Sequence, residues 1–271
     1  MRQFVTDKNP ENGILVISGK DFRYLRQVLR LSVGDMFTVR LPGGILQNTT
    51  VAKIDDGERK ITLQVCSGSV SENADSLNGE NLPSEKLKKI WLFMFVPKPS
   101  KFEQIVRQAT ECGVERIIPV VSEFSQKGAD KMNFRGDRFA RIIKEARQQS
   151  GSAVETSVED VISVDELCEM WKNDGSVKFG CVLYERSDFT VSMSRAFAEN
   201  SNVAELEKSA VVVGSEGGIS PSEIEKLKNA GFVPVHFRTN ILRCETAAIY
   251  GLSVLQNLIE EKFENAGEEE R

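Results

Sequence analysis

The 271-residue sequence contains a single histidine, His236, and this scarcity argues against several kinds of site. His236 lies in an apolar run that we predict to be a strand, which favours a core or edge position over a catalytic one. A Ser-His-Asp hydrolase and a histidine-based metal site are therefore disfavoured.

Cysteine pairs and long apolar runs are also lacking. The five cysteines are scattered and never form a Cys-x-x-Cys pair. This pattern predicts a reducing cytoplasm, with neither disulfides nor zinc. No apolar run reaches membrane-spanning length, and the first residues, MRQFVTDKNPENG, lack the apolar core of a signal peptide. We expect a cytoplasmic protein with no membrane or metal partner.

Charge is distributed unevenly along the chain. The net charge is −5, yet residues 86–147 hold 14 Lys and Arg against 7 Asp and Glu. The acidic surplus lies in Glu72–Glu85 and in the tail Glu260–Arg271. A basic folded part is compatible with nucleic acid, and solvated charged faces are an equally open interpretation.

Residues 1–66 contain mainly β-rich runs with turn signals between them, which indicates a small barrel. One helix is predicted over Asp21–Leu31, with an inner face of Phe22, Leu25, Val28 and Leu29. Its outer face carries Arg23, Arg26 and Arg30, which could grip phosphates or only keep the helix soluble. Residues 67–88 are polar and predict a linker or a long mobile loop.

From Ile90 onward, apolar strands alternate with amphipathic helices. This alternation predicts an α/β fold, a parallel sheet with helices on both faces and ligands at the carboxyl ends of its strands. Capping boxes predict helix starts at Ser100, Ser163 and Ser220.

The stretch Val211–Gln256 is the most distinctive. A short strand, Val211–Val213, precedes the glycine-rich loop Gly214–Gly218, which lacks the Lys-Ser/Thr of a P-loop. A second strand, Phe232–Phe237, precedes a long helix over Ile241–Ile259. Its first turn carries Arg243 and Glu245, which are costly near a core unless they meet a partner or ligand, or form an ion pair.

The segment VVVGSEGGISPSEI…ILRCETAA resembles the signature of SPOUT-class RNA methyltransferases of the RsmE type. The resemblance spans the chain. Tyr24-Leu25-x-x-Val28-Leu29-Arg30 followed by Gly34-Asp35 is similar to the family's N-terminal motif, and Lys101–Pro119 and Gln149-Ser150-Gly151 are similar to its middle segments. The sequence departs from the family pattern at Arg107, Ser152, Ser215, Arg238, Asn240 and Cys244.

This resemblance implies a PUA-like β-barrel domain over residues 1–68, a flexible linker over 69–88 and a SPOUT methyltransferase domain with a deep trefoil knot over 89–271. It also implies a homodimer that uses S-adenosylmethionine to methylate N3 of a uridine in small-subunit (16S) ribosomal RNA, free or in the assembled subunit. The alternatives are methylation at another RNA position, such as a ribose 2′-hydroxyl, and a non-catalytic RNA-binding or ribosome-assembly protein.

Site residues are carried over by position. The resemblance implies cofactor binding by Leu183, Val213, Gly214, Glu216, Gly217, Gly218, Phe237, Leu242 and Arg243. Because uridine N3 carries a proton, we assign Glu245 or Glu216 as the candidate base and Arg243 as the cation that stabilises the uracil anion. RNA is expected on Arg23, Arg26, Arg30, Lys127, Arg138 and Arg147.

Overall fold

The chain divides into two compact units in the computed structural model. The structure describes residues 3–66, 89–125, 128–129, 133–134, 136–186, 189–200 and 205–269, with side chains to residue 261 except that of residue 200. The first unit comprises Met1–Leu87 and Arg147–Glu155, and the second comprises Lys88–Ala146 and Thr156–Arg271. The predicted linker, 69–88, lies outside the described residues, and the predicted domain boundaries stay a prediction.

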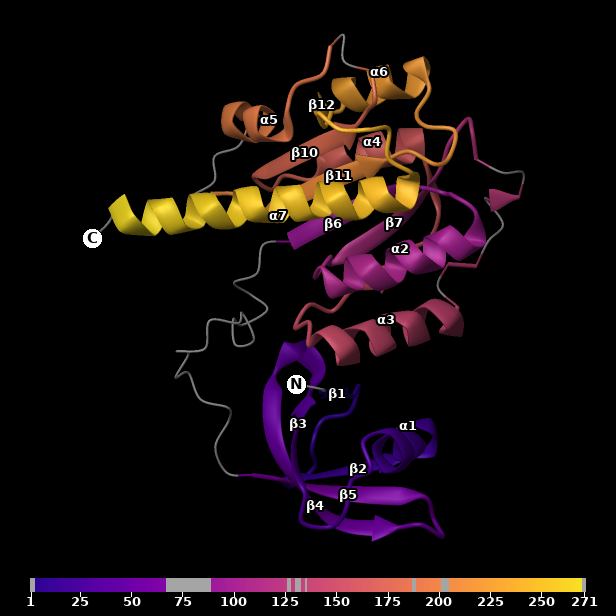
Figure 1. Cartoon of the computed structure of the whole chain (residues 1–271), viewed down its shortest axis with the longest axis vertical. Helices are drawn as coiled ribbons and strands as arrows, with labels where there is room; N and C mark the ends of the chain where they lie inside the picture. The colour runs from indigo at the N-terminus through magenta and orange to yellow at the C-terminus, as the bar shows by residue number, and fades with distance from the viewer. Residues whose placement is uncertain are drawn as a thin grey trace. The chain divides into compact units, whose positions relative to one another are not determined.

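The first unit is built on a five-stranded sheet of order β1-β3-β4-β5-β2 (Figure 1). Its strands are β1 (Phe4–Val5), β2 (Ile14–Ser18), β3 (Met36–Arg40), β4 (Leu46–Asp55) and β5 (Lys60–Val65). All neighbouring pairs are antiparallel except β1 with β3, and β4 carries an irregularity between Val51 and Lys53. The predicted small barrel is a half-barrel that encloses its own apolar core.

The helix predicted over Asp21–Leu31 has two parts. It begins as α1 (Gly19–Arg23) and continues as the π-helix η1 (Tyr24–Val28). Phe22 and Leu25 are buried as predicted, but Val28 is 50% exposed. A π-helix has a wider turn than an α-helix, so Val28 rotates off the inner face.

Segment Arg147–Glu155 belongs to the first unit because a buried guanidinium holds it there. Arg40 is 1% exposed and donates to Gln3 Oε1 at 3.0 Å and to the carbonyl oxygen of Gly151 at 2.8 Å. Its third bond, to the carbonyl oxygen of Gly44 at 2.6 Å, fixes the short 3₁₀ turn η2 (Pro42–Gly44). No local sequence pattern predicts this long-range association.

The second unit contains the predicted parallel sheet, with strand order β12-β10-β11-β6-β7-β8 and β9 paired with β7. Its strands are β6 (Lys89–Phe95), β7 (Arg116–Val121), β8 (Ser157–Val158), β9 (Ile162–Ser163), β10 (Lys178–Leu183), β11 (Lys208–Val213) and β12 (Val233–Val235). Every described pair in this sheet is parallel.

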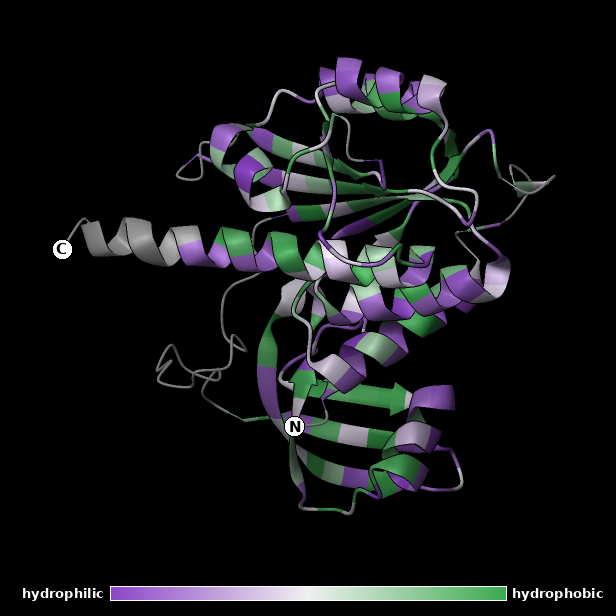
Figure 2. Cartoon of the chain, turned by 45° about the horizontal axis from the view of Figure 1, so that its top comes forward, coloured by the Kyte–Doolittle hydropathy of each residue, from purple (hydrophilic) through white to green (hydrophobic). Residues whose placement is uncertain are grey.

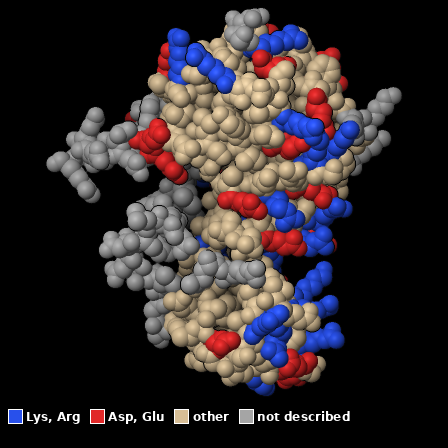
Figure 3. All heavy atoms as spheres, in the orientation of Figure 1, with Lys and Arg blue, Asp and Glu red and all other residues tan. Residues whose placement is uncertain are grey.

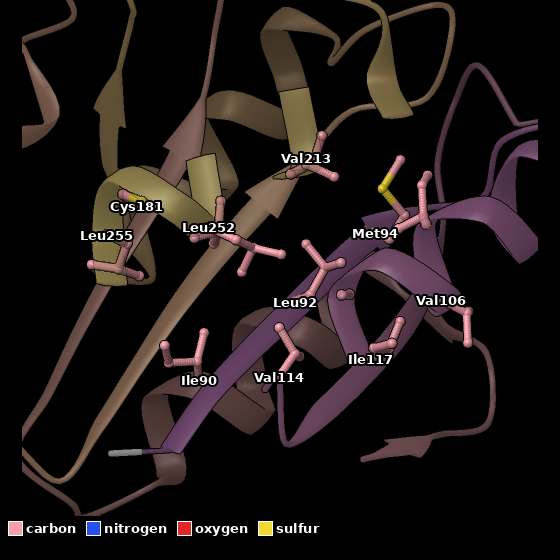
Figure 4. Packing of buried hydrophobic residues seen from close by; sticks show 14 of the residues in the cluster. Ile90, Leu92, Met94, Val106, Val114, Ile117, Cys181, Val213, Leu252 and Leu255 are labelled. Carbon is pink, nitrogen blue, oxygen red and sulfur yellow. The ribbon is translucent and has the colours of Figure 1, made fainter. Parts of the chain in front are cut away.

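Helices cover both faces of this sheet, as predicted. The helices are α2 (Pro99–Glu111), α3 (Asp137–Ser150), α4 (Val164–Asn173), α5 (Met193–Asn200), α6 (Pro221–Asn229) and α7 (Cys244–Glu269). Alternate residues of β6 point to opposite faces. Ile90, Leu92 and Met94 pack with α2, α5 and α7 (Figure 4), whereas Trp91 and Phe93 pack with α4 and α6.

Hydropathy follows this layering. Figure 2 shows largely apolar strands in the sheet and helices that carry both apolar and polar residues. No helix in the described part of the chain combines the length and hydropathy that a membrane span requires. The trefoil knot stays a prediction.

Two of the three predicted capping boxes are present, at Ser163 with Glu166 and at Ser220 with Glu223. The third prediction, at Ser100, is wrong. Helix α2 has Lys98 at its N-cap and Pro99 in its first turn, so Ser100 already lies inside the helix. Proline is pre-organised for the first helical position, and here it moves the helix start forward.

Candidate active site

A cleft opens at the carboxyl ends of β10, β11 and β12, beside the start of α7. It encloses about 710 Å³, counted with its solvent-open mouth. Its place at the carboxyl ends of parallel strands is typical of small-molecule sites in α/β sheets. The lining residues are Leu183, Tyr184, Glu185, Val213, Gly214, Ser215, Gly218, Ile219, Val235, His236, Phe237, Thr239, Asn240, Ile241, Leu242, Cys244 and Ala247.

The glycine-rich loop needs its glycines for close packing. A Cβ on Gly214 would lie 2.8 Å from the carbonyl carbon of Gly218, and one on Gly217 would lie 2.6 Å from Phe124 Cβ. Gly218 has a φ of +78°, in the left-handed region that favours glycine. The amide of Gly218 donates to the carbonyl oxygen of Ser215 at 3.0 Å and closes the turn. The loop therefore places bare backbone in the cleft wall.

The capping box of α6 anchors the other end of this loop. The side chain of Glu223 is buried, and its Oε2 accepts from the amide of Ser220 at 2.9 Å. Its Oε1 accepts from the amide of Glu123, which follows β7, at 2.8 Å. A sequence signal for a helix start thus also ties the glycine-rich loop to a neighbouring strand end.

Four side chains from three distant segments meet beside the cleft. Lys101 Nζ, in the first turn of α2, lies 3.1 Å from Glu245 Oε2 and 3.6 Å from Glu216 Oε1. Glu216 Oε1 also accepts from the amide of Lys98 at 3.3 Å. The thiol of Cys244, which lines the cleft, donates to Glu245 Oε2 at 3.2 Å. We call Lys101, Glu216, Cys244 and Glu245 the lysine cluster.

The lysine cluster fixes the charge of its members. Burial raises the pKa of Glu245, but hydrogen bonds from its own amide, Lys101 and Cys244 outweigh burial and hold that pKa below its usual range. The hydrogen bond to Glu245 raises the pKa of Lys101. Burial and the hydrogen bond to Glu245 raise the pKa of the Cys244 thiol to about 12. At neutral pH Lys101 is therefore an ammonium, Glu245 a carboxylate and Cys244 a neutral thiol.

Arg243 does not pair with Glu245. Its side chain is exposed and has no ion pair or hydrogen bond within the part of the chain that the structure describes. The interpretation of Arg243 and Glu245 as an intrahelical ion pair is therefore wrong, because Lys101 pairs with the carboxylate of Glu245 instead. The alternative interpretation, an ion pair of these residues at a dimer interface, stays a prediction.

The structure brings most of the predicted cofactor residues to the cleft. Leu183, Val213, Gly214, Gly218, Phe237 and Leu242 line it. Glu216, Gly217 and Arg243 do not. Glu216 turns toward Lys98 and Lys101, and Gly217 packs its backbone on Phe124. Within a tight glycine turn, successive residues face different directions, so a motif match does not place all of its residues in one cavity.

Sequence reasoning missed several lining residues, above all Glu185 and His236. Glu185 lies just past the carboxyl end of β10, and the rule that ligands sit at the carboxyl ends of parallel strands could have found it. His236, predicted at a core or edge position, directly follows the edge strand β12, and it also lines the cleft with partial exposure. Its Nδ1 lies 2.7 Å from Thr190 Oγ1.

The predicted RNA-binding residues lie in different environments. Arg23 and Arg30 are exposed. Arg26 is bound to both carboxylate oxygens of Asp56, at 3.2 and 3.3 Å, and to the carbonyl oxygen of Leu31. Figure 3 shows Lys and Arg side chains gathered along one edge of the first unit and mixed with Asp and Glu over the second.

The other three residues predicted to bind RNA are ion-paired, buried or outside the described residues. Arg138 forms a two-point ion pair with Glu103, at 2.7 and 2.9 Å. Arg147 is only 9% exposed, and burial lowers its pKa, so its expected place on an open basic surface is wrong. Lys127 lies outside the described residues.

Comparison with known proteins decides the family. The model of the RNA methyltransferase domain matches residues 83–256, more than half of the chain. The chain belongs to the RNA methyltransferase family. The matched range includes the cleft and the lysine cluster.

Relatives match over almost the whole chain. Ribosomal RNA small subunit methyltransferase E 2 of Borreliella burgdorferi is 27% identical over 96% of this chain and 99% of its own length. Ribosomal RNA small subunit methyltransferase E of Bacillus subtilis is 28% identical over 88% of each chain.

The fold is that of a solved relative. The crystal structure of ribosomal RNA small subunit methyltransferase E from Neisseria gonorrhoeae, bound to S-adenosyl methionine, has a TM-score of 0.75 at 21% identity. The similarity covers 95% of this chain and 98% of that chain, so it includes both units.

Proposed function

We propose that this chain transfers a methyl group from S-adenosylmethionine to N3 of a uridine in 16S ribosomal RNA. The observation that carries the proposal is the cleft, walled by the glycine-rich loop and adjoined by the ionised Glu245. The names of the relatives support ribosomal RNA of the small subunit as the substrate. We further propose a cytoplasmic homodimer that needs no metal ion.

The residues of the cleft fit the cofactor. Leu183, Ile219 and Leu242 offer apolar walls for a purine ring, and the backbone around Gly214 and Gly218 can approach it closely. Glu185 adds a carboxylate able to accept hydrogen bonds from hydroxyl or ammonium groups. When bound, S-adenosylmethionine supplies an electrophilic methyl group on a sulfonium. Ser215, Asn240 and Cys244, which depart from the family pattern, line the cleft without closing it.

Glu245 is the favoured base. Uridine N3 carries a proton, and a positioned carboxylate that receives it contributes roughly 10²–10⁴-fold to the rate. Glu245 is held ionised at the cleft edge through Lys101 and Cys244. Glu216 remains the second candidate. Arg243 has an exposed guanidinium free to meet the negative charge that develops on the uracil oxygens.

RNA binding is proposed first on the exposed Arg23 and Arg30. Replacing both cations should weaken binding uniformly across sequences and reduce the salt dependence by about one phosphate contact each. Arg23→Gln and Arg30→Asn suit this test because Asn tolerates the positive φ, +57°, of Arg30. Arg195→Ala, which removes an exposed cation from α5, is the matched control. An unchanged salt slope in the double variant would place the RNA elsewhere.

The deciding experiment uses ribosomal RNA from cells that lack the gene. Purified protein and S-adenosylmethionine should restore one N3-methyluridine in 16S RNA, which mass spectrometry locates. Methylation of a ribose 2′-hydroxyl would instead identify the alternative enzyme. Failure to bind S-adenosylhomocysteine in calorimetry, with RNA binding intact, would identify a non-catalytic protein.

Variants test the assigned residues. Glu245→Gln and Arg243→Ala should each lower the methylation rate by on the order of 10²-fold or more. Glu225→Gln, which removes an exposed carboxylate from α6, should have the wild-type rate. Wild-type rates for both site variants would show that the assignment is wrong.

A further inference from the structure

Lys101 joins three parts of the chain that are far apart in sequence. It lies in the first turn of α2, while its two partners lie in the glycine-rich loop and in the first turn of α7. The side chains are 24% exposed for Lys101, 32% for Glu216 and 14% for Glu245. Lys101 is not among the residues that line the cleft.

The position of Lys101 is unfavourable for the helix that carries it. A cation near a helix N-terminus opposes the helix dipole, typically by 0.3–1 kcal/mol at an exposed site. No acidic residue lies in the first turn of α2 to offset this cost. The two carboxylates that do offset it come from other segments. The lysine is therefore placed for its partners rather than for α2.

Lys101 and Cys244 bind the same oxygen of Glu245. Both Nζ and Sγ contact Oε2, at 3.1 and 3.2 Å. Two donors on one oxygen fix the orientation of a carboxylate and stabilise its ionised form. Lys101 also attracts Glu216, so a single side chain holds the base candidate and the glycine-rich loop together.

We propose that Lys101 is a positioning residue that keeps Glu245 ionised and oriented to receive the proton of the substrate nitrogen. This inference rests on the proposed function. In the proposed step the N–H bond of the uracil breaks and the proton passes to Glu245. The electron pair left on N3 would form the bond to the methyl carbon while the bond from that carbon to the sulfonium sulfur breaks, its electron pair going to sulfur. Lys101 takes no proton in this step and acts through Glu245.

The first test does not depend on activity. The carboxyl carbon of Glu245 is titrated by ¹³C NMR, with Glu245→Gln to identify its resonance. In Lys101→Met the titration midpoint should rise, because the carboxylate loses its cation, and in Lys101→Arg it should stay near that of the wild type. An unchanged midpoint in Lys101→Met overturns the proposal.

The second test is a double-mutant cycle on methylation. Lys101→Met alone should slow methylation at neutral pH by roughly ten- to a hundredfold, part of the general-base contribution, and move the acidic limb of the rate profile to higher pH. In the Glu245→Gln background, Lys101→Met should have no further effect. A further slowing of similar size would show that Lys101 acts independently of Glu245 and would overturn the proposal.

Binding of S-adenosylhomocysteine separates the possible failures. Each variant should bind it within about threefold of the wild type, which also confirms folding. If the wild type binds it and methylates RNA but Glu245 titrates alike in all variants, only the role of Lys101 fails. If the wild type neither binds it nor methylates RNA, the proposed function fails, and the NMR titration still decides whether Lys101 controls Glu245.

Discussion

The thiol of Cys244 donates a hydrogen bond to Oε2 of Glu245, 3.2 Å away, in the first turn of α7. Burial is the main reason that the pKa of Cys244 rises to about 12, and the hydrogen bond and the nearby carboxylates add to it. The thiol is thereby kept protonated, as a donor that orients the carboxylate. Its place in the cleft wall does not make it a nucleophile.

Cys244 should therefore resist alkylation in the folded protein. At pH 8 its reaction with iodoacetamide should be on the order of a thousandfold slower than that of an unperturbed thiol with a pKa of about 8.5. Peptide mass spectrometry at timed intervals measures this rate. The same protein in urea is the control, because unfolding removes both burial and the carboxylate. Equal rates for Cys244 in folded and unfolded protein would contradict the assignment.

A second charged pair predicts how stability depends on pH. Asp174 accepts hydrogen bonds from Lys208 and Ser176, and Lys208 Nζ also lies 4.0 Å from the centre of the Trp91 ring. Burial raises the pKa of Asp174, but the hydrogen bonds from Lys208 and Ser176 outweigh it and hold the pKa well below the usual range.

A carboxyl group with a depressed pKa stabilises the folded state above its unfolded pKa, about 3.9 for Asp. That contribution is lost as the pH falls below this value toward the folded pKa. The difference in unfolding free energy between wild type and Asp174→Asn should be constant from pH 5 to 7 and shrink below pH 4. Urea unfolding at each pH measures it. Asp165→Asn, from an exposed pair with Lys226, should change stability by no more than about 0.5 kcal/mol. If the difference in unfolding free energy between wild type and Asp174→Asn stayed constant down to pH 3, the pair of Asp174 and Lys208 would not contribute the predicted stability.

On the face of the sheet that α4 and α6 cover, the packing leaves no room for a side chain at Gly180. A Cβ there would lie 2.7 Å from Phe232 Cδ1 and 2.8 Å from Trp171 Cζ2, and these two rings are stacked with centroids 4.9 Å apart. Gly180→Ala should destabilise the protein by about 1–3 kcal/mol, since rigid aromatic rings must shift.

Gly175→Ala is a matched control, because a methyl group there meets nothing within 4 Å. Its effect should stay within about 0.5 kcal/mol. Thermal unfolding of both variants under identical conditions gives the comparison. Equal thermal unfolding midpoints for Gly180→Ala and Gly175→Ala would mean that the stacked rings of Trp171 and Phe232 shift at little cost in free energy.

Local rules predicted the glycine-rich loop and the helix after it. Ser220 and Glu223 lie three residues apart, so the capping box can be read from sequence, and its geometry is present. The alternation of apolar strands and amphipathic helices after Ile90 likewise predicted a sheet covered on both faces, which the packing on the two sides of β6 confirms. In both cases the interactions that decide the structure join near neighbours or repeat with the period of one element.

The lysine cluster could not be predicted this way. Lys101 and Glu245 are separated by more than 140 positions, and each has a closer charged neighbour in sequence, such as Arg243 for Glu245. Arg147 illustrates the reverse error, since charge alone suggested exposure and the fold buries it. Long-range partners and burial depend on the packing of elements, which a periodic pattern does not encode.

The single histidine gives a direct test of the cleft. Thr190 Oγ1 donates its only hydrogen to the carbonyl oxygen of Arg186 at 3.0 Å and lies 2.7 Å from His236 Nδ1. The hydroxyl must therefore accept from Nδ1–H, which fixes the tautomer of the neutral ring and leaves Nε2 as an acceptor. We predict the Nδ1–H tautomer, whereas free histidine favours Nε2–H.

One histidine means one imidazole signal pair in ¹⁵N NMR, so the tautomer can be assigned without ambiguity. Thr190→Val should shift the ring toward the Nε2–H form, because the acceptor for Nδ1–H is lost, while Thr190→Ser should keep the wild-type spectrum. Because His236 lines the cleft, S-adenosylhomocysteine should perturb these signals in the wild type. A dominant Nε2–H tautomer in the wild type would show that Thr190 donates to the ring instead, and Arg186 would then lose its hydroxyl partner.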